Sequence, residues 1–161
     1  MNENARLLLE LLSSKGLTLS SVESLTGGLF GKTITDVPGA SCVYLGGAVT
    51  YSAKLKVELG VRQSTIDRFG VVSAEVASEM AVSGSRRFGA DITISCTGNA
   101  GPTVAEGGKP VGCVYLGLVY RGSAWTIPLQ FGGDRNDIRE STIEAMIAFI
   151  ASLFPKEKES I

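Results

Sequence analysis

A hydroxyl-bearing turn near the N-terminus has the residue types that nucleophilic catalysis needs. The segment Glu23-Ser24-Leu25-Thr26-Gly27-Gly28 follows an alternating apolar stretch and precedes a helical pattern. Its glycines permit close approach of another backbone or a ligand, and the N–H groups at a helix start attract anions. A serine at such a strand-to-helix turn resembles a nucleophile elbow. The alternative is structural: Ser24 or Thr26 caps the helix, and the glycines relieve crowding.

The sequence contains no histidine, which restricts the choice of a catalytic base. Ser-His-Asp triads, Cys-His pairs and histidine-ligated metals are excluded. A base that works near neutral pH must then be Lys, Tyr, Cys or a carboxyl group of shifted pKa. Lys56 lies five residues after Tyr51, where an uncharged apolar stretch ends. Lysine becomes a base when burial or cationic neighbours lower its pKa from about 10.4; a solvated lysine is the alternative, and we expect Lys54 to be one.

Two further segments carry groups that bind anions. Residues 97–110 include four glycines and two prolines, so they predict a loop whose backbone N–H groups face an oxyanion, or else a flexible connector. Arg135 and Arg139 share a helix face just after Asp134, a natural N-cap. That face suits a phosphate or carboxylate, although paired surface arginines are also common.

The hydrophobic periodicity predicts the elements that position these residues. Expected helices are an N-terminal one ending before Gly16, then 29–35, 53–60, 64–69, 73–88 and 134–153. Expected strands are 17–22, 42–51, 91–96, 111–120 and 124–131, the last two forming a hairpin. Helices interleaved with apolar strands indicate an α/β fold, a three-layer α/β/α sandwich around a mixed, mainly parallel sheet of about five strands. Residues 155–161 are expected to be a charged tail.

Composition narrows the class of protein. The length of 161 residues predicts a single domain over 1–161 with its core at about 5–153. A net charge of −1 argues against a nucleic-acid binder. No signal-peptide layout is present and no apolar run approaches the roughly 18 residues of a membrane span, so we expect a soluble, cytoplasmic protein. Cys42, Cys96 and Cys113 each lie in an apolar run and are expected to be buried free thiols.

Seven short segments, taken together and in order, resemble the CinA C-terminal domain family, whose members include nicotinamide-nucleotide amidases of the PncC type. The first is residues 23–28, which are similar to the family's Glu-Ser-Cys-Thr-Gly-Gly. The others are 36–41, 49–52 with Lys56, 70–76, 97–102, 108–112 and 133–135. The likeness covers about 5–153. Larger members carry an additional N-terminal domain resembling molybdopterin-binding proteins, so we expect this chain to be the stand-alone form.

The resemblance implies hydrolysis of the carboxamide of nicotinamide mononucleotide to nicotinate mononucleotide and ammonia, with no cofactor and no metal. It implies Ser24 as nucleophile and Lys56 as its base, with Tyr51 and Thr97 as further catalytic residues. The residues expected to bind the substrate are Thr26, Gly27, Gly28, Gly98, Ala100, Gly101, Arg135 and Arg139. The expected partner is a small pyridine nucleotide, not a nucleic acid or a membrane. A homo-oligomer, a dimer or larger, is compatible with the sequence.

Two residues depart from the family pattern. Leu25 replaces the usual Cys, so an active protein cannot require that Cys, and we expect the Leu25 side chain to turn into the core. Asn99 replaces an apolar residue and is expected to change the polarity of the pocket. Two alternatives to an amidase remain: a non-catalytic nucleotide-binding or interaction module, and an interaction domain for DNA uptake or repair. The latter rests only on the family's competence-related name and finds no support in the near-neutral charge.

Overall fold

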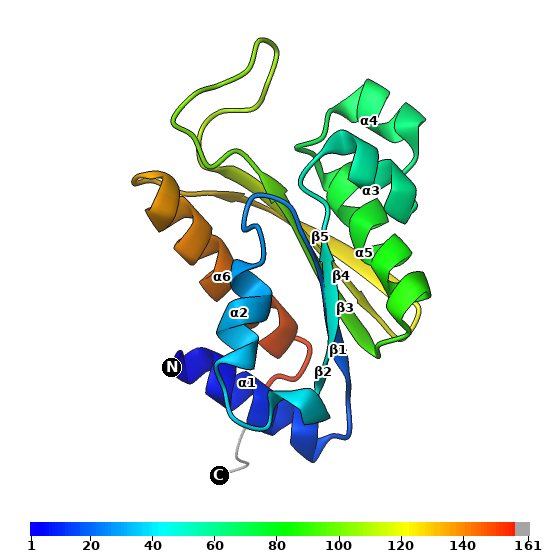
Figure 1. Ribbon diagram of the computed structural model, residues 1–161, viewed down its shortest axis with the longest axis vertical. Helices are drawn as coiled ribbons and strands as arrows, with labels where there is room; N and C mark the ends of the chain where they lie inside the picture. The colour runs from blue at the N-terminus through cyan, green and yellow to red at the C-terminus, as the bar shows by residue number, and fades with distance from the viewer. Residues whose placement is uncertain (157–161) are drawn as a thin grey trace.

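Apolar strands between residues 19 and 130 build one five-stranded sheet in the computed structural model, which describes residues 1–156 (Figure 1). The strands are β1 (Leu19–Glu23), β2 (Tyr44–Val49), β3 (Ile92–Gly98), β4 (Cys113–Tyr120) and β5 (Ser123–Gln130). Their order is β2-β1-β3-β4-β5. Strands β2, β1 and β3 are parallel, and β4 is antiparallel to both β3 and β5. Only β4 therefore opposes the others, and the predicted mixed, mainly parallel sheet is confirmed.

Helices cover both faces of the sheet, as the predicted sandwich requires (Figure 1). One face carries α1 (Glu3–Ser14), α2 (Leu29–Thr35) and α6 (Arg135–Ala151); the other carries α3 (Ala53–Leu59), α4 (Gln63–Phe69) and α5 (Ala74–Phe88). The larger apolar cluster lies on the α1–α2–α6 side, and a small cluster around Val22 and Met80 lies under α5. None of the helices in residues 1–156 combines the length and hydropathy needed to cross a membrane.

Close packing of α5 on the sheet depends on a missing side chain. A Cβ atom at Gly117 of β4 would lie 2.3 Å from the Ala77 carbonyl oxygen and 2.5 Å from Ser95 Oγ. Both distances are far below van der Waals contact, so the helix can approach β4 this closely only over glycine.

The segment before β2 differs from its prediction. Residues 40–42 form a 3-10 turn, and β2 begins at Tyr44 and ends at Val49, so it is shorter than the predicted strand 42–51. Cys42 is consequently exposed, and the expectation of a buried thiol there is wrong. Cys96 is buried and Cys113 is half-buried, and all three thiols are free.

The third strand is longer than predicted. Thr97 and Gly98 pair with Tyr115 and Val114 of β4, so β3 continues beyond Cys96. Thr97 is therefore held in the sheet and is not a loop residue. The loop after β3 projects beyond the end of the sheet (Figure 1). Of the predicted charged tail, residues 157–161 lie outside the described residues.

Candidate active site

The end of strand β1 places Ser24 at the edge of the sheet, between the ends of β2 and β3. The Ser24 N–H donates to the Cys96 carbonyl of β3 at 3.1 Å, and the Ser24 carbonyl accepts from the Gly27 N–H at 3.1 Å. Gly27 and Gly28 have φ values of 58° and 103°, which favour glycine. This is the strand-to-helix turn that the sequence predicts, and only 7% of Ser24 is exposed.

The buried carboxylate of Glu23 fills the start of helix α2. It accepts from the N–H groups of Gly28, Phe30 and Gly31 at 3.2, 2.8 and 3.2 Å, and from Thr26 Oγ1 at 2.7 Å. A carboxylate is favoured at this position because the free N–H groups and the helix dipole are positive there. The protein itself therefore supplies a carboxyl group at the helix start, and these N–H groups are not free to bind a substrate.

Helix α3 brings Lys56 to Ser24. The helix begins after Ser52, whose hydroxyl accepts from the Leu55 N–H at 3.2 Å. Lys56 faces inward from this helix and only 1% of it is exposed. Its Nζ lies 2.8 Å from Ser24 Oγ and 2.7 Å from the Thr50 carbonyl oxygen. The predicted proximity of Ser24 and Lys56 is confirmed.

Burial changes the acidity of Lys56. It lowers the pKa of the ammonium from 10.5 to about 8, because the charged form loses its hydration. Among residues 1–156, no carboxylate lies within salt-bridge distance of Nζ to reverse this effect. Lys54, in contrast, is solvated as predicted. Its side chain is 83% exposed, and its Nζ is 3.9 Å from Glu58.

The acceptors around Nζ are compatible with a neutral amine. The carbonyl oxygens of Thr50 (2.7 Å) and Tyr51 (3.5 Å) can only accept hydrogen bonds. A neutral Lys56 would donate its two hydrogens to them and turn its lone pair toward the Ser24 hydroxyl, which can donate. The arrangement can therefore remove the proton from Ser24 Oγ.

The side chains of Thr97 and Tyr51 make their hydrogen bonds to other residues than this pair. The Thr97 hydroxyl is buried and donates to the Val71 carbonyl at 2.7 Å. In the described residues it makes no hydrogen bond to Ser24 or Lys56. The Tyr51 side chain points outward, and its hydroxyl accepts from Arg135 Nη2 at 3.1 Å. Only the Tyr51 carbonyl faces Lys56.

The two arginines of α6 have different surroundings. Arg139 donates from Nε to the Leu25 carbonyl at 3.1 Å and from Nη2 to the Thr26 carbonyl at 3.0 Å, so it braces the turn that carries Ser24. Arg135 is exposed and donates to the Gly101 carbonyl at 2.5 Å as well as to Tyr51. Leu25 is 4% exposed and belongs to the larger apolar cluster, which confirms the expected direction of its side chain.

Gly98, Ala100 and Gly101, which were expected to bind the substrate, have different surroundings in the structure. Gly98 ends β3, Gly101 faces Arg135, and Ala100 is buried in the apolar core. The side-chain amide of Asn99 is bonded within its own loop. The polar atoms of Asn99 are therefore paired within the loop, and its expected effect on the polarity of the pocket stays a prediction.

Two groups lie at the site that the sequence did not predict there, the Cys96 thiol and the Thr50 carbonyl. The thiol of Cys96 lies 3.2 Å from Thr26 Oγ1, and burial raises its pKa to about 11, so it stays neutral. The Thr50 carbonyl holds Lys56, but every residue has a carbonyl and the sequence cannot single this one out. Alternation along β3 would have indicated only that Cys96 and Thr97 face opposite sides of the sheet.

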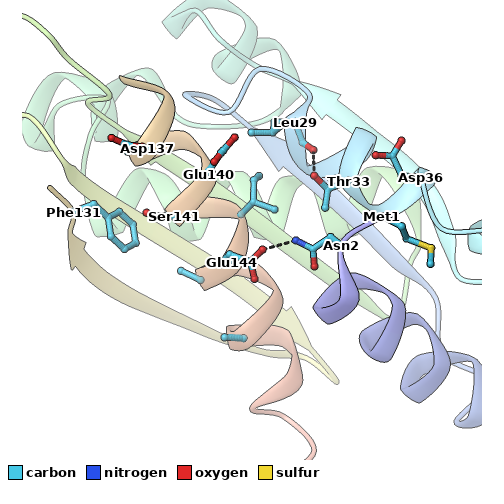
Figure 2. A pocket seen from close by; sticks show the side chains of 13 residues that line it. Met1, Asn2, Leu29, Thr33, Asp36, Phe131, Asp137, Glu140, Ser141 and Glu144 are labelled. Carbon is cyan, nitrogen blue, oxygen red and sulfur yellow. Dashed lines mark hydrogen bonds between the residues drawn. The ribbon is translucent and has the colours of Figure 1, made fainter. Parts of the chain in front are cut away.

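One groove lies away from this pair, between α6 and α2 beside the N-terminus (Figure 2). It measures about 860 Å³ and contains none of the predicted site residues. Two of its carboxylates have structural partners: Glu144 accepts from Asn2 and Asn4, and Asp137 accepts from the Asp134 N–H at the start of α6. A second groove, of about 370 Å³, lies between residues 69–72 and 98–109, next to Thr97. In residues 1–156, no three Cys, Asp or Glu side chains gather as a metal site would require.

Known proteins are similar to this chain in both sequence and fold. A CinA-like protein of Kosmotoga olearia is 45% identical over 145 residues, which are 89% of this chain and 35% of that protein. A CinA-like protein of Dictyoglomus thermophilum is 43% identical over 141 residues, 86% of this chain and 34% of that protein. The chain thus spans about a third of the length of these curated relatives.

Solved structures agree with this relationship. The competence/damage inducible protein CihA from Agrobacterium tumefaciens has a TM-score of 0.90 at 34% identity, covering 95% of this chain and 94% of that one. A CinA superfamily protein from Escherichia coli has a TM-score of 0.91 at 30% identity, covering 94% and 88%. A sequence profile of the CinA C-terminal domain matches residues 1–154. The chain therefore belongs to the CinA C-terminal domain family.

Proposed function

We propose that this protein is an amidohydrolase that converts the carboxamide of nicotinamide mononucleotide to a carboxylate, releasing ammonia, through Ser24 and Lys56. The observation that carries the proposal is the 2.8 Å contact between Ser24 Oγ and the buried Nζ of Lys56. Burial lowers the pKa of this lysine to about 8, so an appreciable fraction is neutral at physiological pH. A Ser-Lys pair is also the natural solution for a chain without histidine.

In the first step, neutral Lys56 takes the proton of Ser24 as Oγ attacks the carboxamide carbon. A C–O bond forms, and the electron pair of the C=O bond moves to its oxygen. When the tetrahedral intermediate collapses, the C–N bond breaks, and Lys56 gives its proton to the departing nitrogen, which leaves as ammonia. An ester on Ser24 remains.

In the second step, water cleaves this ester. Lys56, neutral again, takes a proton from the attacking water, and the new C–O bond replaces the bond to Oγ. The proton then passes from Lys56 to Ser24 Oγ as it leaves. The products are the carboxylic acid, which ionises, and the free enzyme.

Backbone N–H groups near Ser24 are suited to hold the developing oxyanion. The Leu25 N–H directly follows the nucleophile, and within residues 1–156 it has no hydrogen-bond partner. The Asn99 N–H donates to β4 (Cys113 carbonyl, 3.0 Å), so strand alternation turns the Gly98 N–H to the other side, beyond the end of β1. The N–H groups of Gly27 and Gly28 are already bonded to Ser24 and Glu23.

The choice of a pyridine nucleotide follows the resemblance to the amidases of the family. Arg135 adds a physical reason, because its exposed guanidinium lies at the same edge of the sheet and suits a phosphate. Arg139 is a weaker candidate for that role, because two of its nitrogens already hold the turn that carries Ser24.

Ammonia release from nicotinamide mononucleotide tests the proposal. Ser24→Ala and Lys56→Ala should each lower kcat by about 10³-fold or more, and the double variant should be scarcely worse, because the two residues act as a unit. Lys54→Ala is the matched control and should retain wild-type turnover. Ser24→Ala should still bind the nucleotide in calorimetry, because a hydroxyl adds little to ground-state affinity. A wild-type protein that binds the nucleotide without releasing ammonia would instead be a binding module, and full turnover by Ser24→Ala would eliminate the mechanism.

A further inference from the structure

The side chain of Asn99 connects both arms of the loop that follows β3. Its Nδ2 donates to the carbonyl oxygens of Thr103 and Lys109, each at 3.1 Å, and its Oδ1 accepts from the Gly101 N–H at 2.8 Å. Both amide hydrogens and the carbonyl oxygen are thus engaged. Thr103 follows the start of the loop and Lys109 precedes its end, so one side chain ties the two arms together.

The loop turns at Gly101 in a conformation that other residues adopt poorly. Gly101 has a φ of 76°, and a Cβ atom there would lie 2.7 Å from a methyl carbon of Val111. Asn99 holds the chain on both sides of the Gly101 carbonyl, through the Gly101 N–H before it and the Thr103 carbonyl oxygen after it. These two bonds together limit the direction of the Gly101 carbonyl.

That carbonyl is one of the two acceptors that hold Arg135. Arg135 Nη1 donates to the Gly101 oxygen at 2.5 Å, and Nη2 donates to the Tyr51 hydroxyl at 3.1 Å. Arg135 is itself exposed, so packing does not determine where its guanidinium lies. Tyr51 in turn places its backbone carbonyl 3.5 Å from Lys56 Nζ. A continuous series of contacts therefore runs from Asn99 through Arg135 to the Ser24–Lys56 pair.

We infer that Asn99 is a positioning residue: by fixing the Gly101 carbonyl, it sets the guanidinium of Arg135 where the phosphate of the substrate binds. This inference rests on the proposed function. An apolar residue at position 99 leaves the Gly101 N–H without its side-chain acceptor. A guanidinium that must be ordered during binding contributes less to affinity than one already in place.

The test compares two substrates that share a carboxamide and differ by the phosphate: nicotinamide mononucleotide and nicotinamide riboside. For the wild type, kcat/KM should favour the nucleotide. In Asn99→Ala this preference should fall about tenfold, through a higher KM for the nucleotide, as expected when one charge-assisted contact is lost. Kinetics with the riboside should change less than about twofold, because the Ser24–Lys56 pair is untouched. Arg135→Ala should lose the same preference, and the double variant should lose no more.

A matched control and a second variant keep the test sharp. Asn136→Ala makes the same substitution at an exposed residue of α6. The Asn136 side chain forms no hydrogen bond within residues 1–156, so this variant should keep the wild-type preference for the nucleotide. Asn99→Leu keeps the branch at Cγ but removes the polar atoms, and it should behave as Asn99→Ala, should the alanine variant fail to fold. Cleavage by a glutamate-specific protease after Glu106, in the exposed loop, should be faster in both Asn99 variants and unchanged in Asn136→Ala.

Dissociation constants measured in a Ser24→Ala background separate the inference from the proposed function. If the wild type releases no ammonia but Asn99→Ala still loses the preference for the nucleotide in binding, the amidase proposal fails and the role of Asn99 stands. If Asn99→Ala weakens nucleotide and riboside equally, Asn99 acts only on the fold and the inference is overturned. An unchanged preference overturns it as well.

Discussion

Replacing Lys56 by methionine should abolish a pH dependence of stability together with the activity. The folded protein holds the pKa of Lys56 at about 8, against an ordinary value of 10.5, because burial disfavours the ammonium. Between these two values the unfolded chain binds more protons than the folded one, so the free energy of unfolding rises with pH. The destabilising effect of the buried charge is complete below pH 8 and is relieved as the pH approaches 10.5.

The magnitude follows from the two pKa values. The whole difference corresponds to about 3 kcal/mol, and the slope within the window approaches about 1.4 kcal/mol per pH unit. Between pH 7 and pH 10 the wild type should therefore gain about 2.5 kcal/mol relative to Lys56→Met. Comparing the two proteins cancels the titration of the other lysines, tyrosines and cysteines. At neutral pH the methionine variant avoids a buried charge but leaves the Thr50 carbonyl without its donor, so the two effects partly offset.

Urea unfolding followed by circular dichroism at pH 7, 8, 9 and 10 measures this difference. Lys54→Met is the control, and its stability curve should run parallel to that of the wild type, because Lys54 is solvated in both folded and unfolded states. The kinetic counterpart is a rise of kcat/KM with pH whose midpoint lies near 8. Parallel stability curves for the wild type and Lys56→Met, or a kinetic midpoint near that of free lysine, would refute the reasoning.

Two other substitutions test how the site is supported. Glu23→Gln exchanges the carboxylate at the start of α2 for an amide whose NH₂ faces backbone N–H groups, and it should cost about 1–3 kcal/mol in urea unfolding; an unchanged midpoint would contradict the capping role. Gly117→Ala forces a methyl group against the Ala77 carbonyl and Ser95 and should lower the melting temperature by several degrees, at a cost of about 1–3 kcal/mol, whereas Gly132→Ala, which meets nothing within 4 Å, should melt as the wild type does.

The elements and their order follow from local sequence patterns. Apolar residues at helical spacing, uncharged strand segments and glycines at the ends of helices predict all six helices and five strands that the described residues contain. The boundaries shifted where pairing between strands decided them: Thr97 and Gly98 joined β3 because β4 offered partners. At residues 40–42 local turn geometry replaced the start of a predicted strand, and Cys42 became exposed.

The residue types of the candidate pair are equally visible in the sequence. A serine in a strand-to-helix turn, a lysine near the end of the next strand and the absence of histidine together restrict the chemistry that the chain can perform. The direction of Leu25 was predictable as well, because neighbouring residues at a strand end face opposite ways.

The roles of the remaining charged and polar groups were decided only by the tertiary structure. Arg135 and Arg139 share a helix face, yet one holds the turn at Ser24 and the other reaches Tyr51 and Gly101. The acceptors that select between them are mainly backbone carbonyls, which every residue possesses, so no residue type marks them. The burial of Lys56 is likewise not marked by any residue type. The pKa of Lys56 depends on how much water α3 and the sheet exclude together, and that is a property of segments distant in sequence brought into contact by the fold.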